Sequence, residues 1–333
     1  MKLLASRLTS VALLVVLGLL AASCGGSDDS STAPVSAEDA GFPLTFTNCG
    51  KEFTLDSAPE RVLIMEPAAP SLLFAVGAMD RVVARIDDFS EEYYNPDEMA
   101  ILDTVPALQA EFTSTGGAMI SIETIIDYEP DIVIGYDTEI ITHDALADVG
   151  IQLYVMPPFC DNPPEPSFES IVEEVRLYGR LFGTEEIANA SAAQMEAAVT
   201  AAADSPVAEG KTAVALGVGT GGGPLYAYSS LGMVHPLMEA LGMTNPFADF
   251  GERVFEVSLE EIIDRNPDIL VLLYWEVDLP PEQVRALVTD LPGASSIKAV
   301  AEGKVYPLQF NFAEPPSPIV VRGLSVLGDQ IAE

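Results

Sequence analysis

The chain has 333 residues, of which 51 are Asp or Glu and 15 are Lys or Arg, and its formal net charge is −36 at pH 7. A surface this acidic repels phosphate backbones, which argues against nucleic acid as a partner. The charge is spread along the chain, as expected for solubility or a salty habitat, and it disfavours strongly anionic ligands unless basic residues line the site.

The N-terminus predicts a lipoprotein signal, because Lys2 and Arg7 precede an apolar run from Val11 to Leu20 and small residues stand directly before Cys24. The run is shorter than the about 20 apolar residues of a spanning helix, which disfavours the alternative of an uncleaved anchor. We expect residues 1–23 to be removed and Cys24 to carry acyl chains that hold the protein on the extracytoplasmic face of the membrane. Residues 24–42 then form a flexible tether.

Short apolar runs alternate with helical patterns in the first half of the mature chain. The strand candidates are Arg61 to Met65, Arg81 to Arg85, Asp131 to Tyr136 and Gln152 to Met156. Strands that are apolar at nearly every position, separated by helices, predict a parallel sheet covered on both faces. Residues 43–166 are therefore predicted to form an N-terminal α/β lobe.

A twelve-residue phrase occurs twice, as SIETIIDYEPDI from Ser121 and as SLEEIIDRNPDI from Ser258, with eight of the twelve residues identical. Each copy predicts a short helix with a serine cap and a glutamate in its first turn, ending before a proline that precedes an apolar strand. A weaker echo lies upstream of each copy, at residues 73–77 and 238–242. The repeat predicts two similar lobes with a cleft between them.

Between the halves, Ser167 can cap a helix that Gly183 ends. Its apolar residues recur at three- and four-residue steps: Phe168, Ile171, Val172, Val175, Tyr178, Leu181 and Phe182. About 15 residues span roughly 22 Å, enough to cross between lobes. We predict that residues 167–183 bridge the lobes, although periodicity alone also allows a crossover helix within one lobe.

The second half, residues 184–333, repeats the alternation. Its strand candidates are Thr212 to Val218, Asp268 to Trp275 and Val305 to Phe310, with helices predicted over residues 234–241, 281–289 and 320–331. The predicted fold class is α/β, with two Rossmann-like lobes that have mainly parallel sheets and one long bridging helix between them.

Cys49 and Cys160 are the two cysteines left after Cys24. An exported chain meets oxidising conditions, so we expect a disulfide that ties the N-terminal segment to a later loop of the same lobe. Two unpaired thiols are the alternative.

Two short motifs resemble cofactor-binding sites, but the residues that follow them do not predict the secondary structure that such sites require. Gly217, Gly219 and Gly222 have the spacing of a dinucleotide fingerprint, but Pro224 follows where a helix must start. Residues 210–212 resemble the end of a phosphate loop, but a strand follows. The only histidines are His143 and His235, so histidine-based catalysis and histidine-rich metal sites are poorly supported. We expect no catalytic residues, no directly bound metal and no cofactor.

These features together resemble the ABC-importer substrate-binding lipoproteins for iron-siderophore and cobalamin complexes. The resemblance covers residues 43–331 and is carried by the two Ser-x-Glu helices, Pro59-Glu60-Arg61-Val62, residues 75–77 and Asn48-Cys49-Gly50, the last being typical of an actinobacterial branch. It implies a class III fold and docking of one glutamate from each lobe on the permease, at Glu123 and Glu260. An acidic residue in a first turn is also stabilised by the helix dipole alone.

Ligands of open parallel sheets bind beyond the carboxyl ends of the strands. In the first lobe these ends carry Glu66, Arg85, Phe89, Tyr136 and Phe159, and in the second they carry Tyr226, Tyr228, Tyr274, Trp275, Phe310 and Phe312. We predict ligand contacts at Arg85, Tyr136, Tyr226, Tyr228, Trp275, Phe310 and Phe312, because aromatic rings and a guanidinium suit a bulky metal chelate. Arg322 is a further candidate, and burial in the core is the alternative for each residue.

The sequence therefore predicts a monomeric, membrane-tethered binding protein that captures an Fe(III) chelate of the siderophore type and passes it to an ABC permease and its ATPase. Cobalamin, haem or another cofactor-like molecule such as a deazaflavin precursor is the alternative cargo on the same fold. A secreted α/β enzyme or a surface adhesion module is a more distant alternative.

Overall fold

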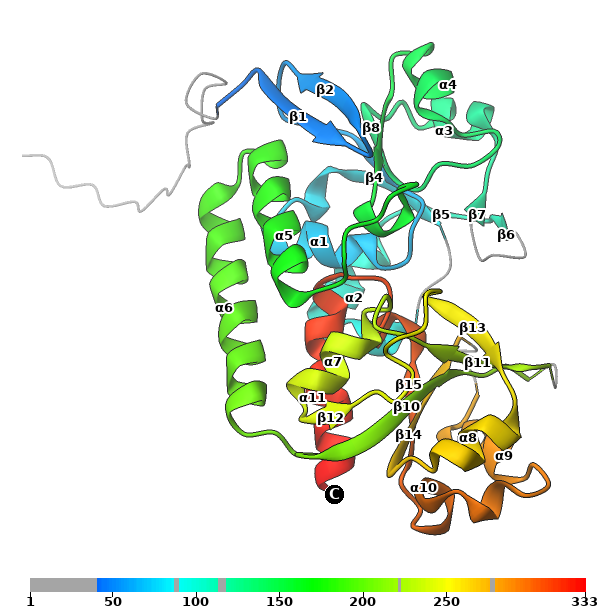
Figure 1. The fold of residues 1–333 in the computed structure, drawn as a ribbon. Coiled ribbons are helices and arrows are strands. Elements are labelled where there is room, and N and C mark those ends of the chain that lie inside the picture. The colour runs from blue at the N-terminus through cyan, green and yellow to red at the C-terminus, as the bar shows by residue number, and fades with distance from the viewer. Residues whose placement is uncertain (1–40, 87–89, 113–117, 221–222, 276–278) are drawn as a thin grey trace, which may run out of the picture. The chain divides into compact units, whose positions relative to one another are not determined.

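A computed structural model describes residues 41–86, 90–112, 118–220, 223–275 and 279–333, and Figure 1 shows their arrangement. The predicted signal, Cys24, Phe89, Gly222 and nearly all of the tether lie outside these residues. The described residues belong to one compact unit. No helix of the described ranges is both long enough and apolar enough to cross a bilayer.

The first sheet is entirely parallel, with strand order β5-β4-β3-β8-β9. Its strands are β3 (Val62–Ile64), β4 (Val82–Ile86), β5 (Ala107–Leu108), β8 (Ile132–Gly135) and β9 (Gln152–Val155). The accompanying helices are α1 (Ala69–Val76), α2 (Pro96–Leu102), α3 (Ile122–Asp127) and α4 (His143–Ala147). The four strands predicted here are confirmed to within one or two residues.

An antiparallel hairpin of β1 (Leu44–Asn48) and β2 (Lys51–Leu55) precedes the first sheet. Its two-residue loop needs positive φ at Cys49 (47°) and Gly50 (78°), which suits a glycine. The buried Asn48 side chain exchanges hydrogen bonds of 2.7 and 2.9 Å with the main chain of Val155 on edge strand β9. Cys49 is joined to Cys160 by a disulfide bond. The Asn-Cys-Gly motif therefore fastens the hairpin to the first lobe.

The second sheet is mixed. Its path is β13-β11-β10-β14-β15, and β12 also pairs with β10. The strands are β10 (Lys211–Gly217), β11 (Leu225–Tyr228), β12 (Met243–Thr244), β13 (Val254–Val257), β14 (Ile269–Tyr274) and β15 (Val305–Gln309). The three predicted strands β10, β14 and β15 are parallel neighbours. The antiparallel strands β11 and β13 were missed, because they are short and only half of each is buried.

The helices of the second half are α7 (Val234–Ala240), α8 (Leu259–Arg265), α9 (Pro281–Thr289), α10 (Lys298–Ala301) and α11 (Pro318–Ala332). The helices predicted over residues 234–241, 281–289 and 320–331 are confirmed. Three short 3-10 helices bear on the site: η2 (Glu91–Tyr93), η3 (Pro157–Phe159) and η5 (Phe310–Phe312). A further two-stranded sheet pairs β6 (Glu111–Phe112) with β7 (Ala118–Met119).

The repeated phrase has the same structure in both lobes. Ser121 and Ser258 accept a hydrogen bond of 3.1 Å from the main chain three residues later and cap α3 and α8. Each copy leaves its helix through a residue with positive φ, at Glu129 (46°) and Asn266 (44°). The aspartate after the proline, Asp131 or Asp268, then accepts main-chain hydrogen bonds at the start of the neighbouring strand. The phrase therefore folds into one helix-turn-strand unit that is used twice.

The predicted bridging helix is present with the expected ends, as α5 (Phe168–Phe182) capped by Ser167 and Gly183. It does not lead into the second sheet by itself. The chain turns into α6 (Glu185–Asp204), and it is α6 that leads to β10. Figure 1 shows α5 and α6 side by side. A Cβ at Gly179 would lie 2.4 Å from that of Ala188, so glycine permits this close approach. The helix that leads from one half to the other is therefore α6, which directly follows the predicted segment, residues 167–183.

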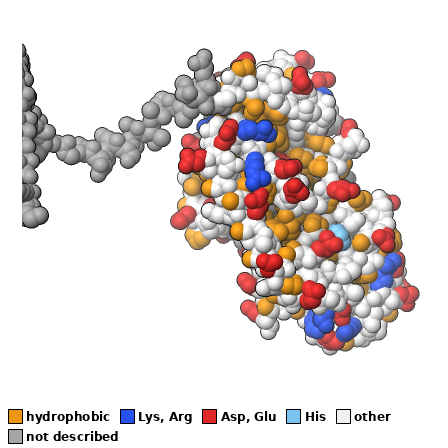
Figure 2. Space-filling model, turned by 60° about the vertical axis from the view of Figure 1, so that its left-hand side comes forward, with side chains coloured by type: hydrophobic (Ala, Val, Ile, Leu, Met, Phe, Trp, Pro, Cys, Tyr) orange, Lys and Arg blue, Asp and Glu red, His pale blue; other side chains and the backbone are white. Residues whose placement is uncertain are grey.

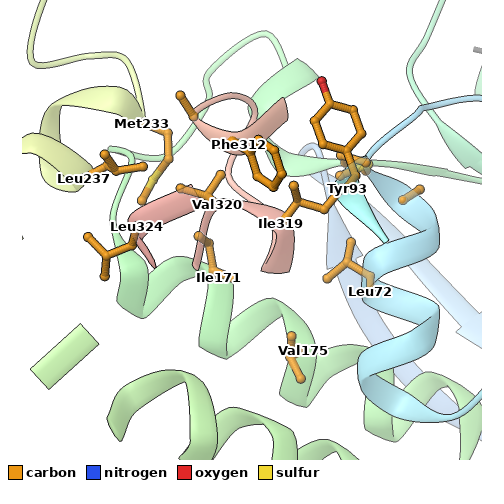
Figure 3. Packing of buried hydrophobic residues seen from close by; sticks show 14 of the residues in the cluster. Leu72, Tyr93, Ile171, Val175, Met233, Leu237, Phe312, Ile319, Val320 and Leu324 are labelled. Atoms are coloured by element: carbon orange, nitrogen blue, oxygen red, sulfur yellow. The ribbon is translucent and has the colours of Figure 1, made fainter. Parts of the chain in front are cut away.

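One hydrophobic cluster extends through both halves of the chain. It contains residues of α1, α5, α7 and α11, and Figure 3 shows Leu72, Ile171, Val320 and Leu324 among the side chains that meet there. Helix α6 packs against α1 of the first half and against α7 and α11 of the second. A shared core of this kind resists large hinge motions, because opening it would expose apolar surface.

Candidate functional site

A cavity of about 2070 Å³ is lined by residues from both halves of the chain. Glu66 and Tyr136 follow β3 and β8 of the first sheet, and Trp275 and Phe310 follow β14 and β15 of the second. The cavity therefore lies at the carboxyl ends of the strands, as expected for parallel α/β sheets. It exceeds the roughly 300–1000 Å³ of common ligand pockets, so it can hold a large molecule.

Aromatic rings form the wall contributed by the second half. Trp275 is stacked on Phe310, with 4.7 Å between ring centroids. The exposed fractions of Trp275 (52%), Tyr226 (42%) and Leu231 (41%) are high for large apolar side chains. Such exposure at a cavity marks a surface that can bury the apolar part of a ligand. On the face shown in Figure 2, hydrophobic side chains gather in a strip across the middle, flanked by acidic ones.

Arg253 and Glu314 form an ion pair in the same wall. The Arg253 guanidinium donates to the Glu314 carboxylate at 3.1 Å and is itself about half exposed, whereas Glu314 is buried. Burial raises the pKa of Glu314 to about 7 against the opposing effect of Arg253, and the Val234 N–H also donates to the carboxylate at 3.4 Å. The carboxylate holds the guanidinium in place, so Arg253 can donate to ligand oxygens.

Helix α5 forms part of the opposite wall. The Tyr154 hydroxyl donates to the Glu174 carboxyl group at 3.2 Å, and burial raises the pKa of Glu174 to about 8. Arg176 is bound to Glu196 of α6 at 2.8 Å. Arg180 lies one turn further along and also lines the cavity. This wall is therefore charged, in contrast to the aromatic wall.

Five of the predicted contact residues line the cavity: Tyr136, Tyr226, Tyr228, Trp275 and Phe310. Glu66 and Phe159, from the wider set of strand-end residues, also line it, and Phe159 packs edge-on against Tyr136. Tyr228 is buried, and burial raises its pKa, so it presents a neutral side chain.

The structure does not bring Arg85 or Phe312 to the cavity. Arg85 is buried in the first sheet, where its guanidinium donates to the main-chain oxygens of Leu102 and Ile86. Phe312 belongs to the shared core and packs edge-on against Tyr93, with 5.0 Å between ring centroids. Each side chain has its packing or hydrogen-bond partners within the protein, so the structure adds no support to a ligand contact at Arg85 or Phe312, and both stay predictions.

Tyr274 and Arg322 also lie elsewhere. Tyr274 is buried in the second hydrophobic cluster. Arg322 of α11 donates to both carboxylate oxygens of Glu98 on α2, one of them at 2.7 Å, and to the Tyr93 carbonyl at 2.8 Å. It thus connects the two halves of the chain, a role that its helical position in the sequence did not reveal.

The sequence analysis missed Arg253, Arg176 and Arg180. Arg253 stands directly before β13, which was not recognised as a strand, and the other two belong to a helix that was assigned only a bridging role. The composition could have drawn attention to them, because basic residues are scarce in this chain and these are three of its 15 Lys and Arg residues.

Glu123 and Glu260 lie outside the cavity on α3 and α8, and both are exposed. The two glutamates occupy the same position in the two copies of the repeated helix-turn-strand unit. Hydrogen bonds from its own main-chain N–H and from the Ser121 hydroxyl lower the pKa of Glu123, so its carboxylate is ionised at neutral pH.

The described residues contain no cluster of three or more His, Cys, Asp or Glu side chains suited to hold a metal ion. The polar groups of the cavity are guanidiniums, carboxyl groups and phenols. This set can hydrogen bond a metal chelate from outside its coordination shell, which differs from ligating the bare ion.

Known proteins resemble this chain over most of its length. A family model described as periplasmic binding protein matches residues 62–311. The crystal structure of an ABC-type Fe3+-hydroxamate transport system from Saccharomonospora viridis has 38% identity and a TM-score of 0.78, covering 88% of this chain and 100% of that chain. A cobalamin-binding protein of Halobacterium salinarum is 25% identical over 298 residues, or 85% of this chain and 73% of that protein.

A periplasmic heme-binding protein from Roseiflexus sp. RS-1 shares the fold, with 21% identity and a TM-score of 0.62 over 82% of this chain and 98% of that chain. Proteins of this kind bind solutes and are not enzymes. The chain therefore belongs to the periplasmic binding protein family, in the class III group whose members serve iron-siderophore, haem and cobalamin transport.

Proposed function

We propose that this protein captures an Fe(III) chelate of the siderophore type in the cavity and delivers it to an ABC permease. The observation that carries the proposal is the pairing of an exposed aromatic stack, Trp275 on Phe310, with the half-exposed guanidinium of Arg253 at one large cavity. The rings would cover the apolar parts of a chelate and the guanidinium would donate to its oxygens. The Saccharomonospora structure, at 38% identity, supports a hydroxamate ligand.

Three further elements complete this proposal. Cys24 carries the lipid anchor, which keeps the protein beside its permease as a monomer on the extracytoplasmic face of the membrane. Glu123 and Glu260 dock on the permease, one from each lobe. The protein catalyses no reaction and needs no cofactor of its own, since the iron arrives already coordinated by its chelator.

Cobalamin is a second candidate cargo, and the Halobacterium relative supports it. A corrin ring is also large and partly apolar, so the aromatic wall suits it as well. The ferric chelate is preferred because the more similar of these two proteins, by identity, is the one associated with Fe3+-hydroxamate.

The proposal can be tested by titration that follows the fluorescence of Trp275, the only tryptophan in the chain. A ferric trihydroxamate should quench this fluorescence at saturation, and the iron-free hydroxamate should bind far more weakly. Phe310→Ala should weaken binding by about ten-fold through loss of one aromatic contact. Phe250→Ala removes a comparable stacked ring, paired with Phe255 away from the cavity, and should leave affinity unchanged. Tight binding of cobalamin with no binding of ferric chelates would reject the proposal.

A further inference from the structure

The cavity has more acidic than basic side chains. Eight of the residues that line it are Asp or Glu, and three are Arg. The acidic residues come from separate elements, since Glu139 follows β8, Glu173 lies on α5 and Glu185 begins α6. The excess therefore comes from several parts of the cavity wall and does not depend on one local cluster.

The arginines do not cancel this excess. Arg176 is already paired with Glu196, which does not line the cavity, and Arg253 is paired with Glu314. Burial raises the pKa of Glu174 to about 8 and that of Glu314 to about 7. With these two and the buried Glu66 left out, five acidic side chains still line the cavity against three guanidiniums.

The whole chain adds to this local field, because its formal net charge is −36. Salt screens charges beyond about 8 Å at physiological ionic strength, so the wall of the cavity dominates the energy of a bound ligand. The overall charge acts on the approach of the ligand, by repelling anions and attracting cations.

We infer that the cavity selects chelates whose net charge is zero or positive and discriminates against anionic ones, such as the triply negative ferric tricatecholates. This inference rests on the proposed function and specifies the class of chelate. A neutral ferric trihydroxamate core would place its oxygens near the arginines and a pendant ammonium group near the carboxylates. Haem, with its two propionates, would be disfavoured on the same grounds.

The test uses one scaffold in three charge states. A linear trihydroxamate with a terminal amine forms a ferric complex of charge +1, its N-acetyl derivative is neutral, and its N-succinyl derivative has charge −1. Binding to the full-length protein should be about ten-fold or more tighter for the amine than for the succinyl form. Raising NaCl from about 0.05 to about 0.5 M should weaken binding of the amine, strengthen that of the succinyl form and leave the acetyl form nearly unchanged.

Variants locate the effect. Glu139→Gln, Glu173→Gln and Glu185→Gln combined should reduce the preference for the amine over the succinyl form several-fold. The pair Glu173→Gln with Glu185→Gln has a matched control in Glu169→Gln with Glu186→Gln, which lie on the same two helices but do not line the cavity and should keep the preference. Equal affinity for the three forms would overturn the inference and leave the proposed function standing. Failure of all three forms to bind would overturn both.

Discussion

The two lobes share a frame but contribute different walls to the cavity. At the amino ends of the central strands the two lobes are nearly identical. Each has a serine-capped helix with an exposed glutamate, a residue with positive φ after the helix, and an aspartate, Asp131 or Asp268, that accepts main-chain hydrogen bonds and is called the aspartate clamp below. At the carboxyl ends, the second lobe contributes Trp275 and Phe310 to the cavity, while the first half contributes Tyr136 and the charged residues of α5. The comparison teaches that the repeated unit specifies the shared helix-turn-strand structure, while the residues after the strands give the two lobes different cavity walls.

The largest expected effect comes from removing the glutamate of each repeat, which tests whether the two lobes play equivalent roles in docking. Glu123→Ala combined with Glu260→Ala should abolish ligand uptake by cells, because each lobe would lose its contact with the permease, while affinity for the ferric chelate stays unchanged. Uptake of the radiolabelled chelate and fluorescence titration measure the two quantities separately.

A matched control exists in the same repeat. Asp127 and Asp264 are the equivalent exposed acidic residues near the other ends of α3 and α8. Asp127→Ala with Asp264→Ala removes the same charge and should leave uptake intact. Loss of ligand affinity in the glutamate variant, or equal loss of uptake in both variants, would show that the repeat has no specific docking role.

The disulfide distinguishes the lobes, since it fastens the hairpin to the first lobe alone. Cys49→Ser with Cys160→Ser releases a covalent link between residues 111 positions apart, and should lower the free energy of unfolding by about 2–4 kcal/mol. Ligand affinity should change little, because neither cysteine lines the cavity. Urea denaturation of the variant and of reduced wild-type protein measures the effect, and a loss below about 1 kcal/mol would show that the Asn48 hydrogen bonds suffice.

The frame could be predicted from the sequence because its signals are local. Strand-forming apolar runs, the serine caps and the Ser167 to Gly183 helix each depend on neighbouring residues, and all were located within one or two positions. Strands β11 and β13 were missed because an antiparallel edge is specified by distant partners. Helix α6 was missed for the same reason, because its alanine-rich sequence gives little indication that it packs against both halves of the chain.

The cavity was less predictable than the frame. Aromatic residues at strand ends were identified because the strand ends themselves were known. Arg85 was chosen on the same rule, but its side chain is buried and donates to the main-chain oxygens of Leu102 at the end of α2 and of Ile86 in β4. To predict that Arg253 lies at the cavity, one would have to know where β13 lies and that Glu314, 61 residues further along the chain, pairs with Arg253. Contacts of this kind arise from tertiary structure and leave no local pattern.

The smallest expected difference between the lobes concerns the two aspartate clamps. Among the described residues, Asp131 accepts hydrogen bonds from the main chain of Glu60 and Arg61, whereas Asp268 also binds the Lys298 ammonium at 2.6 Å. The Lys298 hydrogen bond, followed by that from the Thr212 main chain, lowers the pKa of Asp268 to about 2.

The stabilisation from Asp268 should be complete above the pKa of an unfolded aspartate, near 4, and should be lost as the pH falls through about 2. Asp268→Asn should therefore lower the free energy of unfolding by about 1 kcal/mol at pH 7, a modest value because solvent screens the pair, and by progressively less as the pH falls from 4 toward 2. Asp131→Asn, which loses no ion pair, should cost about half as much. Urea denaturation at pH 7, 4 and 2.5 measures both. Equal, pH-independent losses in the two variants would mean that the clamps act only through main-chain hydrogen bonds and that Lys298 adds nothing to the second lobe.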